Sequence, residues 1–276
     1  MRLSPELSMN GSVKIRYYLL GGLLLITLLL VCVFACFQLF SSHKTSPYSY
    51  VIKTESVHAE FLSADASYPQ IQGMEAISIQ NAINQRIESG VHSSPPKSAN
   101  PPPGCEPTSM NCVIFRHQNA IVSELTRKYL SIQLGSYEDF PGSSHPSHNG
   151  YSLNFDLETG NELQLDDFFL LNSNYLQVIS GKIRGDLIKQ LSHAPSEMII
   201  DGTQPDGAHF LDFVLTEKGF LFLFDDYEVA PYVYGNPGVL IPYDELANIL
   251  IPSFRQEIET FTPSPLINPR AGGDGS

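Results

Sequence analysis

The sequence has few cysteines and few basic residues, and both shortages narrow what the protein can be. Only four cysteines occur in 276 residues, and only Cys105 and Cys112 lie outside one long apolar run, so a four-thiolate zinc site cannot form. Lys and Arg number 16 against 29 Asp and Glu. Such an acidic surface repels nucleic acid and anionic lipid. We therefore expect no nucleic-acid partner; the excess charge either serves only solubility or favours a cationic partner.

Charge is absent altogether from Tyr17 to Phe37. At about 1.5 Å per residue, a helix over this run spans the ~30 Å hydrocarbon layer of a bilayer. The run is too long for the apolar core of a cleaved signal peptide, and no A-x-A-like cleavage site follows it. The sequence therefore predicts a transmembrane anchor over residues 17–40. Lipidation at Cys36 is an alternative, although the bulky Phe34 stands where a lipobox has a small residue.

The cations that flank this run predict its orientation. Arg2, Lys14 and Arg16 precede it, with Glu6 as the only acid, so residues 1–16 form a cytoplasmic tail and the chain crosses the cytoplasmic (inner) membrane once, with the N-terminus inside. The remainder is then extracytoplasmic, or periplasmic. Without the three cations and one anion of that tail, the totals of 16 and 29 become 13 and 28, a net charge of −15 beyond the membrane.

A segment rich in proline, residues 91–112, can be neither helix nor central strand and is predicted to be a loop. Cys105 and Cys112 both lie in it. An even number of cysteines in an oxidising compartment is more simply a disulfide than a metal site. We therefore predict a Cys105–Cys112 bridge within this loop.

Short strand-like and helix-like patterns follow one another without regular alternation, which favours an α+β fold with an antiparallel sheet and packed helices, preceded by the one transmembrane helix. We expect this domain to occupy residues 48–252, and the tail 253–276 to be disordered at its end. Residues 66–73 are interpreted as a link between elements. Strands are expected at 50–61, 113–116, 120–125, 129–137, 151–157, 163–165, 210–215, 220–224 and 239–241, and helices at 74–87, from Asp166 or Asp167 to 191, and at 243–250.

Four motifs in this order resemble the C-terminal extracytoplasmic domain of the RsiV family, a domain similar also to part of the deacetylase PdaC and to secreted mycobacterial antigens. They are Gly142 to His145, Tyr151 to Leu157, Leu165 to Phe168, and Tyr227 to Gly235. The resemblance implies recognition of lysozyme, a cationic protein. Anti-sigma activity is not expected, because only about sixteen residues precede the predicted anchor and they cannot form a sigma-binding domain.

The segment around His145 has three readings. Ser143 or Ser144 with His145 and Asp139 resembles a nucleophile, a base and an orienting acid, although a G-x-S-x-G elbow is missing. His145 and His148 with Asp206 or His209 are a second combination, for a metal. The third reading is a turn shaped by Gly142 and Pro146, and we therefore expect no metal and no cofactor. The residues of these readings are Asp139, Gly142, Ser143, Ser144, His145, Pro146, His148, Asp206 and His209.

The late aromatic segment supplies the expected binding residues. Tyrosines combine apolar area with a hydroxyl and so suit a sugar or peptide surface, although they also pack loops onto sheets. The predicted anchor and these tyrosines indicate a membrane-anchored binding or sensor module of the bacterial envelope, and the family resemblance implies that it recognises a lysozyme-like cationic protein or a cell-wall glycan. The alternative is an envelope hydrolase that acts on an ester or glycan through the Ser/His pair. The expected binding residues are Tyr227, Glu228, Pro231, Tyr232 and Tyr234.

Overall fold

A computed structural model describes residues 46–92, 104–105 and 112–259, which belong to one compact unit, Thr45–Ser276. The predicted cytoplasmic tail and the predicted anchor lie outside the described residues. Within those residues, no helix is both long enough and apolar enough to cross a membrane. The predicted disulfide is present: Cys105 and Cys112 are bonded, with their Cα atoms 5.5 Å apart.

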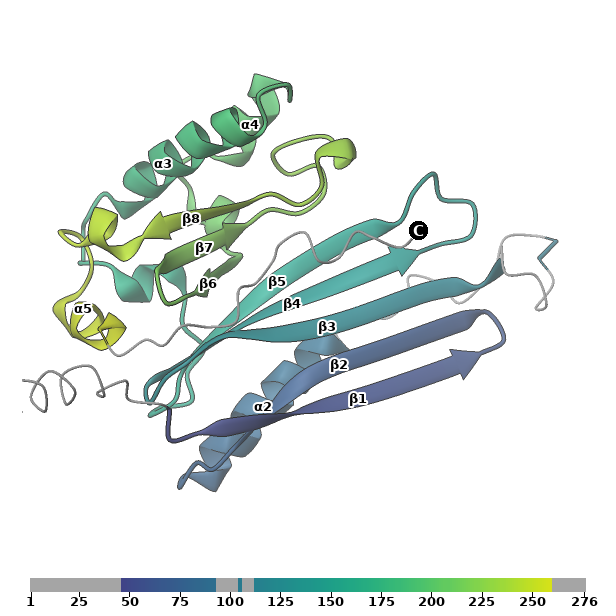
Figure 1. Cartoon of the computed structure of the whole chain (residues 1–276), viewed down its shortest axis with the longest axis horizontal. Coiled ribbons are helices and arrows are strands. Elements are labelled where there is room, and N and C mark those ends of the chain that lie inside the picture. Colours follow the sequence, from purple (N-terminus) through teal and green to yellow (C-terminus); the bar gives the residue numbers. More distant parts are fainter. Residues whose placement is uncertain (1–45, 93–103, 106–111, 260–276) are drawn as a thin grey trace, which may run out of the picture. The chain divides into compact units, whose positions relative to one another are not determined.

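The larger of two sheets has five strands in sequence order (Figure 1). Neighbouring strands are antiparallel except β2 and β3, which are parallel. A parallel pair needs a long crossover between its strands, and the connection from β2 to β3, which contains helix α2, is long enough. The strands are β1 (Ser49–Ala59), β2 (Leu62–Gln72), β3 (Ile114–Leu125), β4 (Tyr129–Asp139) and β5 (Ser147–Asp156). The antiparallel expectation is therefore correct for every pair but one.

Strand β2 occupies the stretch interpreted from sequence as a link, so that interpretation is wrong. Pro69 made it unattractive as a strand, because proline cannot donate to a ladder. However, β2 pairs with β3 only from Leu62 to Ser67, so Pro69 lies beyond that ladder and pairs with Ile52 of β1 alone. A proline is tolerated where one side of the strand has no partner.

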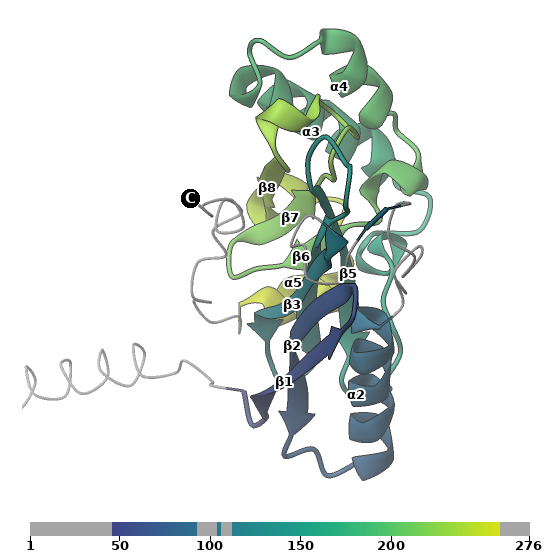
Figure 2. The same ribbon diagram turned by 90° about the vertical axis from the view of Figure 1, so that its right-hand side faces the viewer.

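Helix α2 (Ile77–Val91) covers one face of the large sheet (Figures 1 and 2). Ile83 and Ile87, four residues apart on one side of the helix, are fully buried against Tyr68, Leu134 and their neighbours. This is the amphipathic helix expected from residue 74 onward, although it begins three residues later. It holds that face of the sheet by apolar burial.

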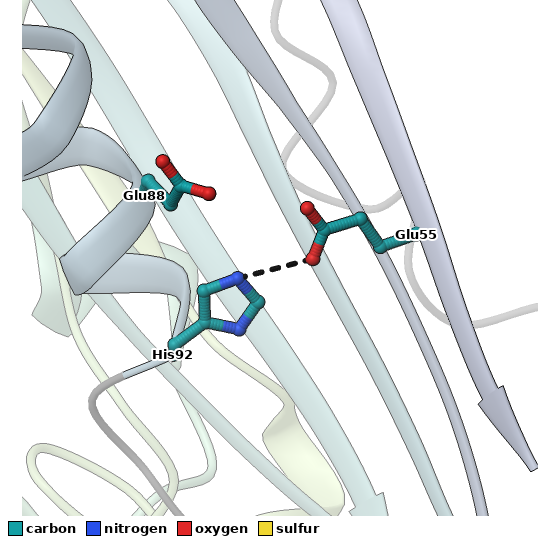
Figure 3. A group of neighbouring side chains, drawn as sticks. All are labelled: Glu55, Glu88 and His92. Atoms are coloured by element: carbon teal, nitrogen blue, oxygen red, sulfur yellow. Dashed lines mark ion pairs between the residues drawn. The ribbon is translucent and has the colours of Figure 1, made fainter.

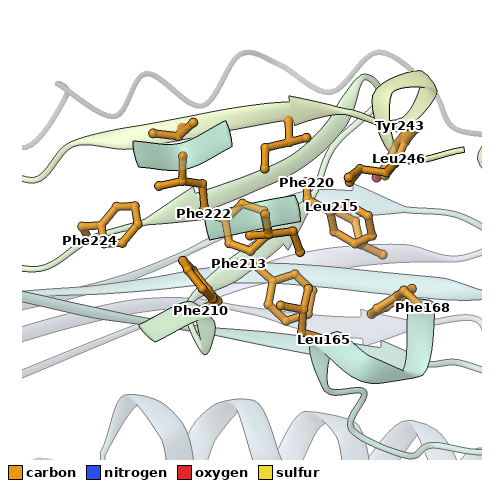
Figure 4. Close-up of a cluster of buried hydrophobic side chains, with 14 of the residues drawn as sticks. Leu165, Phe168, Phe210, Phe213, Leu215, Phe220, Phe222, Phe224, Tyr243 and Leu246 are labelled. Atoms are coloured by element: carbon orange, nitrogen blue, oxygen red, sulfur yellow. The ribbon is translucent and has the colours of Figure 1, made fainter. Parts of the chain in front are cut away.

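A second sheet of three antiparallel strands forms the rest of the unit. Its phenylalanine-rich strands build a second core with the helices around them (Figure 4). The predicted hairpin at 210–224 is confirmed as β6 and β7, and the predicted strand at 239–241 as β8. The elements are η2 (Leu165–Phe168), α3 (Tyr175–Gln190), α4 (Ser196–Gly202), η3 (Gly207–Phe210), β6 (Phe213–Leu215), β7 (Gly219–Leu223), η4 (Tyr232–Tyr234), β8 (Gly238–Pro242), η5 (Tyr243–Leu246) and α5 (Pro252–Ile258).

Buried polar side chains join the small sheet to the large one. Ser131 of β4 donates from Oγ to Asn154 Oδ1 at 2.6 Å and accepts from the backbone N–H of Leu215 in β6 at 2.8 Å. Asn154 in β5 in turn donates from Nδ2 to the carbonyl of Phe213 at 2.9 Å. Both side chains are at most 2% exposed, so these bonds satisfy backbone groups of β6 away from water. Strand β6 is fixed against β4 and β5 by side chains instead of a continuous ladder.

One local expectation in this part is wrong. The helix expected from Asp166 or Asp167 is divided: η2 ends at Phe168 and α3 begins at Tyr175, while the Asp167 carboxylate accepts the N–H of Gln164. Gly219 does not have the positive φ typical of a turn glycine. A Cβ there would lie 2.1 Å from the carbonyl oxygen of Ile241, so the close approach of β8 is what requires glycine.

Candidate functional site

An aromatic cluster forms where the loop before β5 meets the segment between β7 and β8. The ring of His145 stacks on that of Tyr232, with centroids 3.9 Å apart, and its Nε2 lies 2.9 Å from the hydroxyl of Tyr227. His148 stacks more loosely on Tyr232 at 5.8 Å and contacts Tyr137, its cross-strand neighbour, edge-on. We call these five residues the aromatic cluster; they come from β4, β5, η4 and two loops.

A tight turn presents Tyr227 of this cluster. The N–H of Glu228 donates to the carbonyl of Asp225, and the Glu228 carboxylate accepts the N–H of Asp225 at 2.9 Å. Tyr227, inside this turn, has φ of 68°, a conformation that side chains other than glycine, asparagine and aspartate rarely adopt. The residue as a whole is 54% exposed. The backbone therefore holds a strained residue so that its aromatic ring faces solvent beside His145.

Three aspartates, two of them from this turn, accept hydrogen bonds from the free edge of the large sheet. Strand β5 is the last strand of that sheet, so its outward N–H groups have no ladder partner in β4. His148 donates from its N–H to Asp226 Oδ2, Gly150 to Asp225 Oδ1, and Ser152 to Asp212 Oδ1, at 2.8, 2.8 and 3.1 Å. We call these three carboxylates the edge aspartates.

Burial disfavours the ionised form of two of these carboxylates, those of Asp212 and Asp225. It raises the pKa of Asp212 to about 6, against the opposing bond from Ser152. It also raises the pKa of Asp225 to about 7, with a further contribution from the charge of Asp212. The pKa of Glu228 is raised by burial as well. The group can therefore take up protons near neutral pH, which an exposed acidic patch cannot do.

The residues of the predicted catalytic group do not assemble in this geometry. Ser143 donates from Oγ to the carbonyl of Phe140 at 2.8 Å and approaches Asp139 Oδ1 at 3.4 Å. The two ring nitrogens of His145 lie against the carbonyl of Pro146, at 2.7 Å, and the hydroxyl of Tyr227. Among the hydrogen bonds of the described residues, none joins Ser143 or Ser144 to His145. The turn does contain Gly142, which has φ of 84°.

The predicted metal combination is also dispersed. Asp206 accepts the N–H of Ala208 and caps η3, and among the described residues these side chains do not bring three possible ligand atoms within 4.8 Å of one another. Of the predicted binding residues, Tyr227 and Tyr232 lie together in the aromatic cluster, whereas Tyr234 packs on the core of the small sheet. The Glu228 carboxylate turns back to its own turn, and Pro231 only precedes η4.

Sequence reasoning missed the participation of Tyr137 and His148 in the cluster, and missed Asp212 altogether. The one available signal for Asp212 was an acid placed among apolar residues, in Phe210 to Leu215. The signal for His148 was its position in the strand pattern: β5 begins at Ser147, so His148 lies in the strand and not in the preceding turn.

Comparisons with known proteins address part of the chain. Residues 166–244 match a family model described as a protein of unknown function, DUF3298. The matched segment includes Asp212, the turn at residues 225–228 and Tyr232. Two solved structures of that family are similar to this one: a member from Bacteroides fragilis, with a TM-score of 0.56, and one from Pseudomonas aeruginosa, with 0.53, each 16% identical. They cover 77% and 75% of this chain, and 97% and 95% of their own. At this identity the likeness shows the fold alone.

Curated mycobacterial proteins are also similar to this chain. The chain is 23% identical over 189 residues to the immunogenic proteins MPB64 of Mycobacterium bovis and MPT64 of Mycobacterium tuberculosis, over 68% of this chain and 76% of theirs. It is 24% identical over 146 residues to an esterase of Mycobacterium tuberculosis, over 53% of this chain. The chain spans 62% of that esterase. The expected likeness to mycobacterial antigens is confirmed, while the RsiV assignment stays a prediction.

Proposed function

We propose that this chain is a membrane-anchored, extracytoplasmic binding module of the bacterial envelope that recognises a cationic protein of the lysozyme class through the aromatic cluster and the acids around it. The observation that carries the proposal is the stack of His145 on Tyr232 beside the exposed ring of Tyr227. An exposed aromatic ring such as that of Tyr227, next to carboxylates, is suited to Lys and Arg side chains, which gain from both.

The charge around the cluster supports a cationic ligand. Burial, and then the charges of Asp226 and Asp139 with neighbouring tyrosines, raise the pKa of the Tyr232 hydroxyl, so it remains a neutral donor in a negative field. The Asp226 side chain is only 8% exposed, and its Oδ1 has no hydrogen-bond partner among the described residues. From this position the Asp226 charge acts on the cluster through space, since it also raises the pKa of Tyr232, and a negative charge there favours a cationic ligand.

A second candidate is ester hydrolysis, favoured by the similarity to the mycobacterial esterase. It needs a serine hydroxyl within hydrogen-bond reach of a histidine nitrogen. In the site as folded, Ser143 and His145 bond elsewhere, so a movement of the loop before β5 is required first. This requirement makes catalysis the weaker of the two candidates.

One panel of variants separates the two candidates. The full chain, Tyr232→Ala, His145→Ala, Ser143→Ala and the control Tyr50→Ala are each tested for lysozyme binding, for binding of cell-wall glycan, and for hydrolysis of a p-nitrophenyl ester. Tyr50 is an exposed tyrosine in β1, at the opposite edge of the large sheet. We expect Tyr232→Ala to weaken lysozyme binding about tenfold or more, and Tyr50→Ala and Ser143→Ala to leave it unchanged.

Other results would change the assignment. Ester hydrolysis above background that is lost in both Ser143→Ala and His145→Ala, and kept in Tyr50→Ala, would favour the hydrolase. Binding of glycan instead of lysozyme, with the same dependence on Tyr232, would keep the site and replace the ligand. Binding that is indifferent to Tyr232 and His145 would remove the aromatic cluster from the function.

The proposed location is testable separately. Residues 17–40 are proposed to anchor the chain with its N-terminus in the cytoplasm, which leaves the domain outside the membrane. Protease added to intact spheroplasts is therefore expected to remove a tag fused to the C-terminus and to spare one fused to the N-terminus. A C-terminal tag that survives until the spheroplasts are lysed would refute this topology.

A further inference from the structure

A second cluster of chemically active side chains lies at the other edge of the large sheet, where β1 faces α2 (Figure 3). Glu88 and His92 stand four residues apart at the C-terminal end of α2, and Glu55 projects from β1 toward them. The possible ligand atoms of these three residues all lie within 4.8 Å of one another. His92 Nε2 is 3.2 Å from Glu55 Oε2.

From this geometry we infer that Glu55, Glu88 and His92 form a binding site for a borderline divalent transition cation, with zinc as the test case. Two carboxylate oxygens and one imidazole nitrogen are a donor set that zinc accepts, with further positions left to water. Calcium and magnesium prefer all-oxygen sites and so fit less well. All three side chains are partly exposed, between 33% and 47%, so a metal ion can reach them from solvent.

A buried tyrosine orients the two carboxylates. The hydroxyl of Tyr68, a residue with no exposed surface, lies 2.8 Å from Glu55 Oε1 and 3.2 Å from Glu88 Oε1. Its ring also meets the ring of His92 edge-on, with centroids 6.0 Å apart. Burial is the main cause that raises the pKa of Tyr68 to about 12, so its hydroxyl keeps the proton it donates. Such outer-shell bonds fix ligand geometry in metal sites.

Lys53 is the competitor of the metal. Its Nζ lies 2.8 Å from Glu55 Oε1 and 2.8 Å from Glu88 Oε1, the two oxygens that Tyr68 also contacts. Lys53 lowers the pKa of both carboxyl groups, so they are ionised at neutral pH. A metal on Glu55 Oε2, the second oxygen of Glu88 and His92 Nε2 would share the two carboxylates with the ammonium group. Because like charges repel, Lys53 weakens metal binding without blocking it.

Metal binding would link strand β1 to helix α2. Strand β1 is an edge strand whose residues are nearly all exposed, and Lys53, Glu55 and His92 connect it to the end of α2. A metal held by β1 and α2 together would tie that strand down and so raise the thermal stability of the unit. This site lies apart from the aromatic cluster, and the inference does not depend on the proposed function.

The test is a zinc titration of the full chain by calorimetry, followed in parallel by the melting temperature. We expect saturable binding of one zinc ion, and an increase in melting temperature that chelator reverses. His92→Ala and Glu88→Gln should each weaken binding about tenfold or more, whereas Lys53→Met should tighten it about tenfold. The matched control His58→Ala removes another exposed histidine of the same region and should change nothing. X-ray absorption of the zinc complex should give only N and O ligands, at about 2.0–2.2 Å.

Several results would overturn the site. One is the lack of saturable binding below about 100 μM zinc. Another is binding that His92→Ala leaves intact while His145→Ala or His148→Ala abolishes it. Calcium or magnesium that binds as tightly as zinc would refute the assigned class of metal, and Lys53→Met without tighter binding would refute the competition. Circular dichroism of each variant confirms that it remains folded.

Discussion

At the residue scale, Asp225 combines a structural role with an unfavourable charge. Its carboxylate accepts the N–H of Gly150 at the edge of β5, yet burial and the charge of Asp212 raise its pKa to about 7. Asp212 has a pKa raised to about 6. Both values lie above the ordinary value of 3.8, so between about pH 4 and 7 the folded chain binds more protons than the unfolded chain. The contribution of this pair to stability is therefore largest at low pH and declines as the pH rises through this window.

Asp225→Asn should accordingly stabilise the protein at pH 7.5, by about 1 kcal/mol once solvent screening is allowed for. The amide oxygen can still accept the N–H of Gly150, while the charge is removed. Urea unfolding at pH 5.0 and 7.5 measures the effect, and the gain should shrink at the lower pH. Asp166→Asn, at an exposed aspartate, is the matched control. A loss of stability that is equal at both pH values would mean that the charge itself is needed at the β5 edge.

At the element scale, the strand and helix patterns predicted most of the order of elements, and the failures have identifiable causes. Alternation of apolar residues predicted the second half of β5. Two apolar runs joined by a turn predicted the β6–β7 hairpin, because the residues of both strands are mostly buried. Strand β2 was not predicted because it contains Pro69. The sequence does not show that the ladder between β2 and β3 ends before that proline. The short helices α4 and α5 were missed, because seven residues each carry too little periodicity to be recognised.

The residues of the candidate site could likewise be predicted only where a local sequence pattern indicated them. Tyr227 and Tyr232 could be selected from the local aromatic pattern, but their partner His145 lies 82 positions before Tyr227 and comes from a different loop. The edge aspartates could not be predicted, because their role depends on β5 being the last strand of its sheet. That position in the sheet is decided by pairing between distant segments, on which local pattern gives no information.

At the scale of the whole molecule, the large sheet has a distinct cluster at each edge: acids and aromatic rings at β5, and the Glu55–Glu88–His92 group at β1. Acidic residues outnumber basic ones in the sequence, and the net charge of −13 produces a field that attracts a cationic partner to the cluster at β5. Such a field acts on the approach of the partner, and the stacked rings act on the complex once formed. The two contributions therefore predict different kinetic effects.

The most direct test of the proposed function is the kinetics of lysozyme association with the full chain, measured by surface binding from about 0.05 to 0.5 M salt. We expect the association rate constant to fall about tenfold or more over this range, because salt screens the approach, with a smaller change in dissociation. Tyr232→Ala should mainly raise the dissociation rate constant, and Tyr50→Ala should match the unaltered chain. No interaction at about 100 μM lysozyme, or binding whose rates depend neither on salt nor on Tyr232, would contradict recognition of a cationic protein by this site.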